Sequence, residues 1–187
     1  MANWKNQREE VPMREEGLLK KLVAAHGVSG FEKAVRKIIE EEAAPYADEM
    51  TVDAIGNLIV LKKGRDGADK KKLMFAAHMD EIGFMVKKIE SDGRLKVCNM
   101  GWNWAGSAYN ERVEFQNGIS GVVGCEGWIE DAKNDVGKLF IDIGATSAED
   151  AAKYVKLGDV CGYFGPWIDL QNDRISSRSL DNRIGCY

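Results

Sequence analysis

A short apolar run ends abruptly in polar residues, and this junction constrains the fold more than any other feature. Residues 73–77 read Leu-Met-Phe-Ala-Ala, and His78, Asp80 and Glu81 follow closely. Five apolar residues bounded by polar ones predict a strand buried on both faces, inside a sheet that helices cover. Side chains alternate along a strand, so His78 and Asp80 should project from the same side of its carboxyl end. Open α/β sheets build their sites at that end, and we expect the chemistry there.

The residues alone leave two interpretations of His78. A neutral imidazole is a common metal ligand, and the carboxylate of Asp80 would then fix its tautomer or bind the metal itself. The other interpretation is a histidine that is simply hydrogen-bonded near the end of a strand. Asp181 has a similar position, because it follows a predicted strand at residues 174–177 and begins a predicted helix. By itself Asp181 is typical of a helix N-cap.

The segments before residue 80 predict helices and short strands. Apolar residues recur at helical spacing near the start of the chain, at Leu18, Leu19, Leu22 and Val23. Gly27 ends that helix, and the spacing of Ser29 and Glu32 predicts a capping box in which Ser29 caps the next helix. Two strands are expected at residues 49–52 and 58–61.

The pattern changes after residue 83 to short strands separated by turn signals. The strongest hairpin signal is Asn117-Gly118, which is flanked by apolar strand candidates. Several such strands predict a barrel or a sandwich. We therefore interpret the chain as an α/β protein with an inserted β-rich domain. Residues 1–80 form the first part of the α/β domain, residues 81–171 the insert, and residues 172–187 the return.

Composition limits the class of protein. A net charge of −4 gives no electrostatic reason to expect nucleic acid or an anionic membrane as partner, and 44% hydrophobic residues suit a soluble globular protein. No apolar run is long enough to span a membrane, and the first residues lack a signal-peptide core. The cysteines are far apart, which favours buried free thiols in a reducing cytoplasm over disulfides or a zinc knuckle. Trp102 and Trp104 form either an exposed binding platform or packing on the rim of the β-rich domain.

A set of motifs, taken in order, adds a family resemblance. The motifs are Gly27-Val-Ser-Gly-Phe-Glu32, Asp53-Ala-Ile-Gly-Asn-Leu-Ile-Val60, Ala77-His-Met-Asp-Glu-Ile-Gly-Phe-Met-Val86, Ile141-Asp-Ile-Gly-Ala-Thr-Ser147, Gly158-Asp-Val160 and Leu180-Asp-Asn-Arg-Ile-Gly-Cys186. Each is weak alone, but the ordered set is specific. With it, the chain resembles the M42 family of metallo-aminopeptidases, which includes glutamyl, deblocking and TET aminopeptidases.

The resemblance implies a fold, a cofactor and roles for the site residues. The fold would be part of a metallopeptidase α/β sandwich, with an inserted small β-barrel-like domain through which the protein forms homo-oligomers. The cofactor would be two divalent metal ions, zinc or cobalt. His78 would bind one ion, Asp80 would orient that imidazole, and Asp181 would bridge both ions, with a cis peptide bond between Asp181 and Asn182. The ions would activate water for attack on a peptide substrate, releasing its N-terminal residue.

The family's general-base glutamate, a neighbouring ligand glutamate and later aspartate and histidine ligands correspond to positions beyond Tyr187. We therefore expect the 187-residue polypeptide alone to bind metal weakly, to hydrolyse peptides negligibly and to expose apolar surface that favours association. Two alternatives remain. One is a short non-enzymatic paralogue that acts in assembly or partner binding. The other is a glycosidase using Asp80 and Glu81, although adjacent strand residues point to opposite faces and make a poor catalytic pair.

Overall fold

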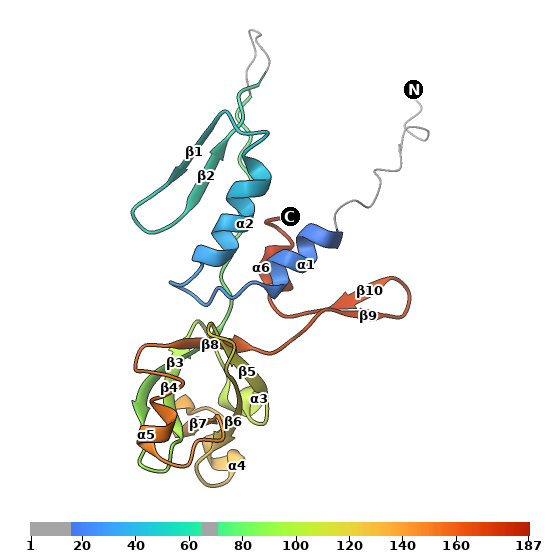
Figure 1. Cartoon of the computed structure of the whole chain (residues 1–187). Coiled ribbons are helices and arrows are strands. Elements are labelled where there is room, and N and C mark those ends of the chain that lie inside the picture. Colours follow the sequence, from blue (N-terminus) through green and yellow to red (C-terminus); the bar gives the residue numbers. More distant parts are fainter. Residues whose placement is uncertain (1–15, 65–70) are drawn as a thin grey trace.

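The computed structural model describes residues 16–64 and 71–187, which form a closed β-barrel with helices and hairpins beside it (Figure 1). The helices are α1 (Glu16–Ala24), α2 (Lys33–Ala43), α3 (Ala105–Ala108), α4 (Ile129–Ala132), α5 (Ala148–Ala151) and α6 (Leu180–Arg183), with a 3₁₀ turn at Val136–Lys138. The strands outside the barrel are β1 (Glu49–Val52), β2 (Leu58–Leu61), β9 (Ile168–Leu170) and β10 (Arg174–Ser176).

The part outside the barrel is built from the predicted helices and hairpins. Helix α1 buries Leu22 and Val23 and packs against α2 and α6, although more than a hundred residues separate α1 from α6 (Figure 1). Strands β1 and β2 pair as an antiparallel hairpin, and β9 and β10 form a second one. The strands expected at residues 49–52 and 58–61 are therefore confirmed.

Six strands close the barrel in the order β3-β4-β7-β6-β5-β8. They are β3 (Gly83–Ile89), β4 (Leu95–Met100), β5 (Arg112–Phe115), β6 (Ser120–Cys125), β7 (Leu139–Asp142) and β8 (Val160–Tyr163). Alternate residues of these strands fill the interior, and closure leaves the barrel without a free sheet edge. Its core includes Phe84, Val86, Leu95, Val97, Val113, Phe115, Val123, Leu139 and Ile141.

The mixed α/β fold with an inserted barrel is the fold class that the sequence and its resemblance predicted, and it is confirmed. The hairpin expected around Asn117-Gly118 joins β5 to β6. Gly118 has a φ of +84°, a conformation that glycine adopts without steric cost. The four cysteines are free, as expected, but only Cys161 is buried, and the other three are partly exposed. Within the described ranges, no helix has the length and apolar character that would let it cross a membrane.

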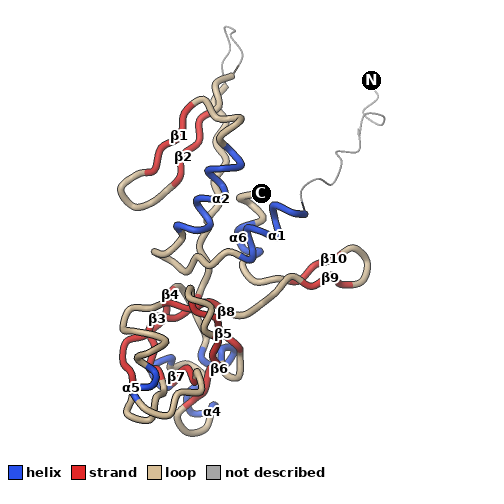
Figure 2. The backbone as a smooth tube through the Cα atoms, in the orientation of Figure 1, coloured by secondary structure: helices blue, strands red, loops and turns tan. Residues whose placement is uncertain are grey.

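The expected central strand at residues 73–77 does not form. Figure 2 draws this stretch as loop, and Leu73, Met74 and Phe75 are 79%, 87% and 87% exposed. A strand requires a hydrogen-bonded neighbour, and a strand apolar on both faces also requires cover. No part of the described chain supplies either to residues 73–77. The nearest ladder contact along the stretch is an isolated parallel bridge between Glu81 and Val28.

The predicted capping box is also wrong. Helix α2 begins at Lys33, and its N-cap residue is Glu32, whose side chain makes no capping hydrogen bond. The backbone of Ser29 pairs instead with Glu81, and the chain then turns at Gly30, with a φ of +85°. Because this pairing holds Ser29 away from the first turn of α2, its hydroxyl donates a hydrogen bond to Asp80.

Candidate metal centre

His78 lies between two carboxylates that come from distant parts of the sequence. Its Nδ1 is 2.8 Å from Oδ1 of Asp80, and its Nε2 is 3.0 Å from Oδ1 of Asp181. The shared side of His78 and Asp80, expected from strand alternation, is present even though the strand itself is not. Both ring nitrogens face carboxylate oxygens, an arrangement that agrees with a hydrogen-bonded histidine and with a metal ligand oriented by Asp80.

The carboxylate of Asp80 is fixed from two sides. Its Oδ1 faces His78, and its Oδ2 accepts a hydrogen bond from the hydroxyl of Ser29. Partial burial raises the pKa of Asp80, but the hydrogen bonds from Ser29 and His78 outweigh burial, and the net pKa lies below its usual value. An ionised Asp80 accepts from the Nδ1–H of His78, which leaves Nε2 as the nitrogen available to a ligand.

The pKa of the His78 imidazole is shifted in the opposite direction. Burial lowers the pKa of His78, but hydrogen bonds and attraction from Asp80 and Asp181 exceed that effect, and the net pKa is raised. Ionised carboxylates cannot donate a hydrogen bond. The two flanking carboxylates therefore favour an imidazole that carries hydrogen on both ring nitrogens, and a bound cation would replace the hydrogen on Nε2.

The backbone around Asp181 excludes the simple helix N-cap interpretation. Ser179 takes the N-cap position of α6, with a φ of +62° and no capping side-chain bond. The peptide bond between Asp181 and Asn182 is cis, as the family resemblance implied. The side chain of Asp181 is 95% exposed, and the side chain of His78 is 55% exposed, so both are open to a solute.

The donor atoms fit part of a metal site. Two ligand atoms bound to one zinc ion at about 2.0–2.2 Å lie roughly 3–3.5 Å apart in ordinary geometries. The 3.0 Å between Nε2 of His78 and Oδ1 of Asp181 agrees with that separation. Among residues 16–64 and 71–187, no group of three or more His, Cys, Asp or Glu side chains is arranged to hold a metal ion. The described residues thus fit two positions of a coordination sphere that normally needs three or four protein ligands.

Three residues near the site were not predicted from the sequence as contributors. The sequence pattern predicts Ser29 as a helix cap, pairs Glu81 with Asp80 only in the glycosidase alternative, and assigns no role to Arg183. Glu81 is buried and points away from His78, toward the buried guanidinium of Arg183. Strand alternation hinted at the opposite directions of Asp80 and Glu81, but no local signal marks Arg183 as buried.

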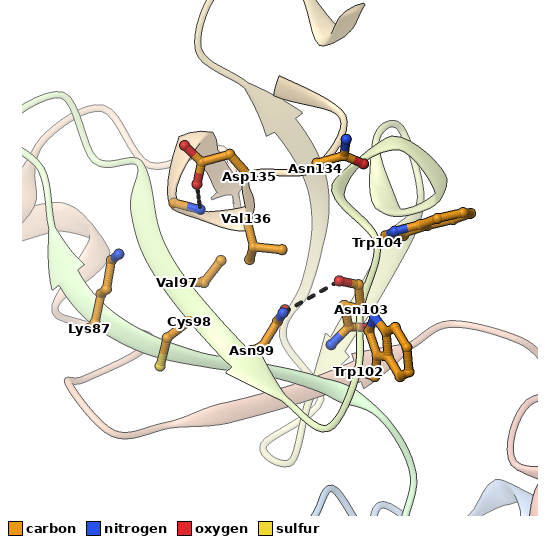
Figure 3. Close-up of a pocket in the computed structure, with 11 residues that line it drawn as sticks. Lys87, Val97, Cys98, Asn99, Trp102, Asn103, Trp104, Asn134, Asp135 and Val136 are labelled. Atoms are coloured by element: carbon orange, nitrogen blue, oxygen red, sulfur yellow. Dashed lines mark hydrogen bonds between the residues drawn. The ribbon is translucent and has the colours of Figure 1, made fainter. Parts of the chain in front are cut away.

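A cavity of about 450 Å³ on the barrel is separate from this centre (Figure 3). Its lining includes Trp102, Trp104, Asn99 and Asp135 and none of the residues around His78. Trp102 is 85% exposed and Trp104 is 65% exposed. Of the two interpretations of these tryptophans, the structure therefore supports an exposed surface and not rim packing.

The mixed α/β architecture with its barrel and the ordered motifs together point to one family. Residues 56–187 match the sequence model of the family described as M42 glutamyl aminopeptidase, and the chain belongs to this family. A putative aminopeptidase of Acetivibrio thermocellus is 46% identical over 170 residues, which cover 90% of this chain and 50% of that protein. The chain spans about half the length of this relative and of other curated aminopeptidases that it matches.

Solved structures agree with this family. A TET aminopeptidase from Thaumarchaeota archaeon SCGC AB-539-E09 superposes with a TM-score of 0.81 at 34% identity, covering 91% of this chain and 50% of that one. A Thermotoga maritima protein described as an endoglucanase gives 0.78 at 38% identity, covering 90% and 51%. The Pyrococcus horikoshii TET1 peptidase, described as assembling into a tetrahedron or a large octahedral shell, gives 0.74 at 34% identity, covering 91% and 53%.

Proposed function

We propose that this chain carries part of the active site of a metal-dependent aminopeptidase, which removes N-terminal residues from peptides. The observation that supports this most directly is His78, held between Asp80 and Asp181 in a member of an aminopeptidase family. His78 and Asp181 are the proposed ligands in a site for two divalent ions, zinc or cobalt. Asp80 is the residue that orients the imidazole.

The roles follow from the hydrogen bonds of each side chain. Asp80 accepts from Nδ1–H of His78, so Nε2, which faces Asp181, is the nitrogen that would bind a metal ion after losing its hydrogen. Oδ1 of Asp181 lies beside Nε2, and its exposed carboxylate has a second oxygen that suits a bridging ligand. Bound divalent ions supply a nucleophilic water at neutral pH and polarise the peptide carbonyl. Ser29 holds the second oxygen of Asp80, so the carboxylate cannot rotate freely away from His78.

Within residues 16–64 and 71–187, one imidazole and one well-placed carboxylate are available to a metal ion, which supports weak binding and negligible hydrolysis by the 187-residue polypeptide alone. We further propose that residues 81–171 form an oligomerisation domain between the catalytic segments 1–80 and 172–187, and that the protein is cytoplasmic. The assemblies described for a TET1 peptidase of similar fold support the oligomer.

The geometry gives no support to a glycosidase that uses Asp80 and Glu81. The carboxylate of Asp80 contacts Ser29 and His78, whereas that of Glu81 is buried against Gly27 and Ser179. Two catalytic carboxyls must face each other across a sugar, and these two face away from each other. The similarity to a protein described as an endoglucanase therefore stays a similarity of sequence and fold.

The chain has two histidines, which makes a direct test possible. In protein labelled with ¹⁵N-histidine, added Zn²⁺ should shift the Nε2 resonance of His78 and leave His26, which is bound to Glu114, unchanged. Asp181→Ala should weaken the Zn²⁺ response of His78. Equal responses of both histidines, or an unchanged His78 at millimolar Zn²⁺, would contradict the proposed site and favour the non-enzymatic alternative.

A further inference from the structure

A buried ion pair lies directly behind the candidate metal centre. Both Glu81 and Arg183 are buried, and the side chain of Arg183 is 0% exposed. Nη2 of Arg183 lies 3.3 Å from Oε1 of Glu81, an ion pair without hydrogen-bond alignment. Two charged side chains in the interior have a large desolvation cost, and an apolar pair of similar volume would often stabilise a fold as well or better. The pair therefore calls for an explanation beyond stability.

Glu81 connects the His78 segment to the Asp181 segment. Its Oε1 accepts a hydrogen bond from the backbone N–H of Gly27 at 3.0 Å. Its Oε2 accepts from the hydroxyl of Ser179 and lies 3.6 Å from Nε of Arg178. Glu81 follows Asp80 directly, and Ser179 precedes Asp181 by two residues. The carboxylate of Glu81, next to one site segment, thus binds the hydroxyl of Ser179, next to the other.

Arg183 makes the reciprocal connection. It follows Asp181 by two residues, and its Nε donates to the carbonyl oxygen of Met79 at 3.0 Å. Met79 lies between His78 and Asp80. The other arm of the guanidinium, Nη1, donates to carbonyl oxygens near the end of helix α1, Leu22 at 2.8 Å and Ala25 at 2.5 Å. The planar fork of arginine can bind these groups at one time, whereas lysine cannot.

The two connections cross between the same two segments. These connections are important because residues 71–80 contain no strand, so no sheet hydrogen bonds fix the position and orientation of His78. The distance from His78 to Asp181 instead depends on side chains that tie Met79 to Arg183 and Ser179 to Glu81. A metal–ligand bond tolerates errors of about 0.2 Å, so a small shift of one segment disrupts coordination.

We propose that Glu81 and Arg183 are positioning residues that set the separation of His78 and Asp181. The inference rests on the proposed function, in which those two residues are metal ligands. Neither Glu81 nor Arg183 contacts the ion. Their effect passes through the backbone of Met79 and the hydroxyl of Ser179. Removing such supporting interactions typically weakens metal binding by about 10–100-fold.

The test uses the 187-residue polypeptide labelled with ¹⁵N-histidine and titrated with Zn²⁺. Glu81→Gln, Arg183→Lys and Ser179→Ala should each weaken Zn²⁺ binding by about tenfold or more and change the His78 ring resonances before zinc is added. In uniformly ¹⁵N-labelled samples of the same variants, the amide resonances of the barrel should stay in place. Glu114→Gln is the matched control, because Glu114 is a partly buried carboxylate that binds His26 and not the site. It should move His26 alone.

Ser179→Ala keeps the experiment decisive if Glu81→Gln fails to fold, since it removes one hydroxyl and leaves the ion pair intact. Wild-type affinity and unchanged His78 resonances in folded Ser179→Ala and Arg183→Lys would overturn the positioning role. A wild-type protein in which zinc leaves His78 unmoved would instead refute the proposed function. In that case the His78 resonances without metal still report whether Glu81 and Arg183 hold it against Asp181.

Discussion

Asp80→Asn isolates the role of the charge that holds His78. Asparagine has nearly the shape of aspartate, so the variant keeps the packing near Ser29 and removes the negative charge. The neutral amide accepts a weaker hydrogen bond from Nδ1–H of His78. We therefore expect a larger share of the tautomer that carries hydrogen on Nε2, and this tautomer cannot bind a metal through Nε2.

The magnitude follows from the exposure of the pair. A hydrogen bond to a charged group contributes about 1.5–3 kcal/mol when it is buried. The side chains of His78 and Asp80 are 55% and 33% exposed. Because solvent screens the pair, we expect its hydrogen bond to contribute an energy at or below the lower end of that range. A loss of about 1.4 kcal/mol corresponds to a tenfold weaker Zn²⁺ affinity, and we expect roughly that change.

The assay is a Zn²⁺ titration of ¹⁵N-histidine-labelled protein at neutral pH, which reports affinity and tautomer together. Asp142→Asn is a suitable control, because Asp142 accepts a hydrogen bond from Gly144 on the barrel and does not contact His78. Asp80→Asn with wild-type affinity and an unchanged His78 tautomer would refute the orienting role. A loss of affinity in Asp142→Asn of the same size would show that the effect is not specific to the site.

Four further outcomes are expected. Phe84→Ala removes a fully buried ring that packs edge-on against Tyr163, and it should lower the free energy of barrel unfolding by about 3–5 kcal/mol in urea denaturation, whereas an effect below about 1 kcal/mol would contradict the assigned core. Burial raises the pKa of Cys161 to about 12, so its thiol should resist Ellman's reagent at pH 8 in folded protein, and labelling as fast as in urea would refute that burial. Phe75→Ser should reduce self-association in sedimentation velocity, because Phe75 is 87% exposed, and a monodisperse wild-type monomer at micromolar concentration would argue against this reasoning. The purified polypeptide should show negligible aminopeptidase activity with zinc or cobalt, and strong activity that a chelator removes would contradict the proposed shortage of ligands.

The barrel could be predicted because its signals are local. The turn at Asn117-Gly118 specifies its hairpin through backbone conformations that few residues adopt, and the flanking strands pair with near neighbours in the sequence. The prediction of a strand at residues 73–77 is wrong, because a strand forms only with a hydrogen-bonded partner, and the residues of the segment do not specify that partner. The apolar residues of the segment favour burial, but in the structure their side chains are exposed.

In the candidate site, too, the contacts between near neighbours in the sequence could be predicted and the distant contacts could not. The closeness of His78 and Asp80 follows from alternation over three residues and holds without a ladder. The approach of Asp181, 103 residues from His78, has no local signal, and the family resemblance alone indicated it. The prediction that Ser29 caps a helix is wrong because a hydroxyl side chain serves equally well in a capping box and in a hydrogen bond to a distant carboxylate.

The dipeptide Asp80-Glu81 shows why one extended segment can serve both a metal centre and its support. Adjacent residues in an extended chain point to opposite sides, so Asp80 faces the exposed side with His78 while Glu81 faces the interior with Arg183. A shift of this segment that moves Glu81 away from Arg183 also moves His78 and Asp80 relative to Asp181. The buried ion pair and the exposed histidine are therefore coupled through a single peptide unit, and substitutions at Glu81 and Asp80 should be non-additive in Zn²⁺ affinity.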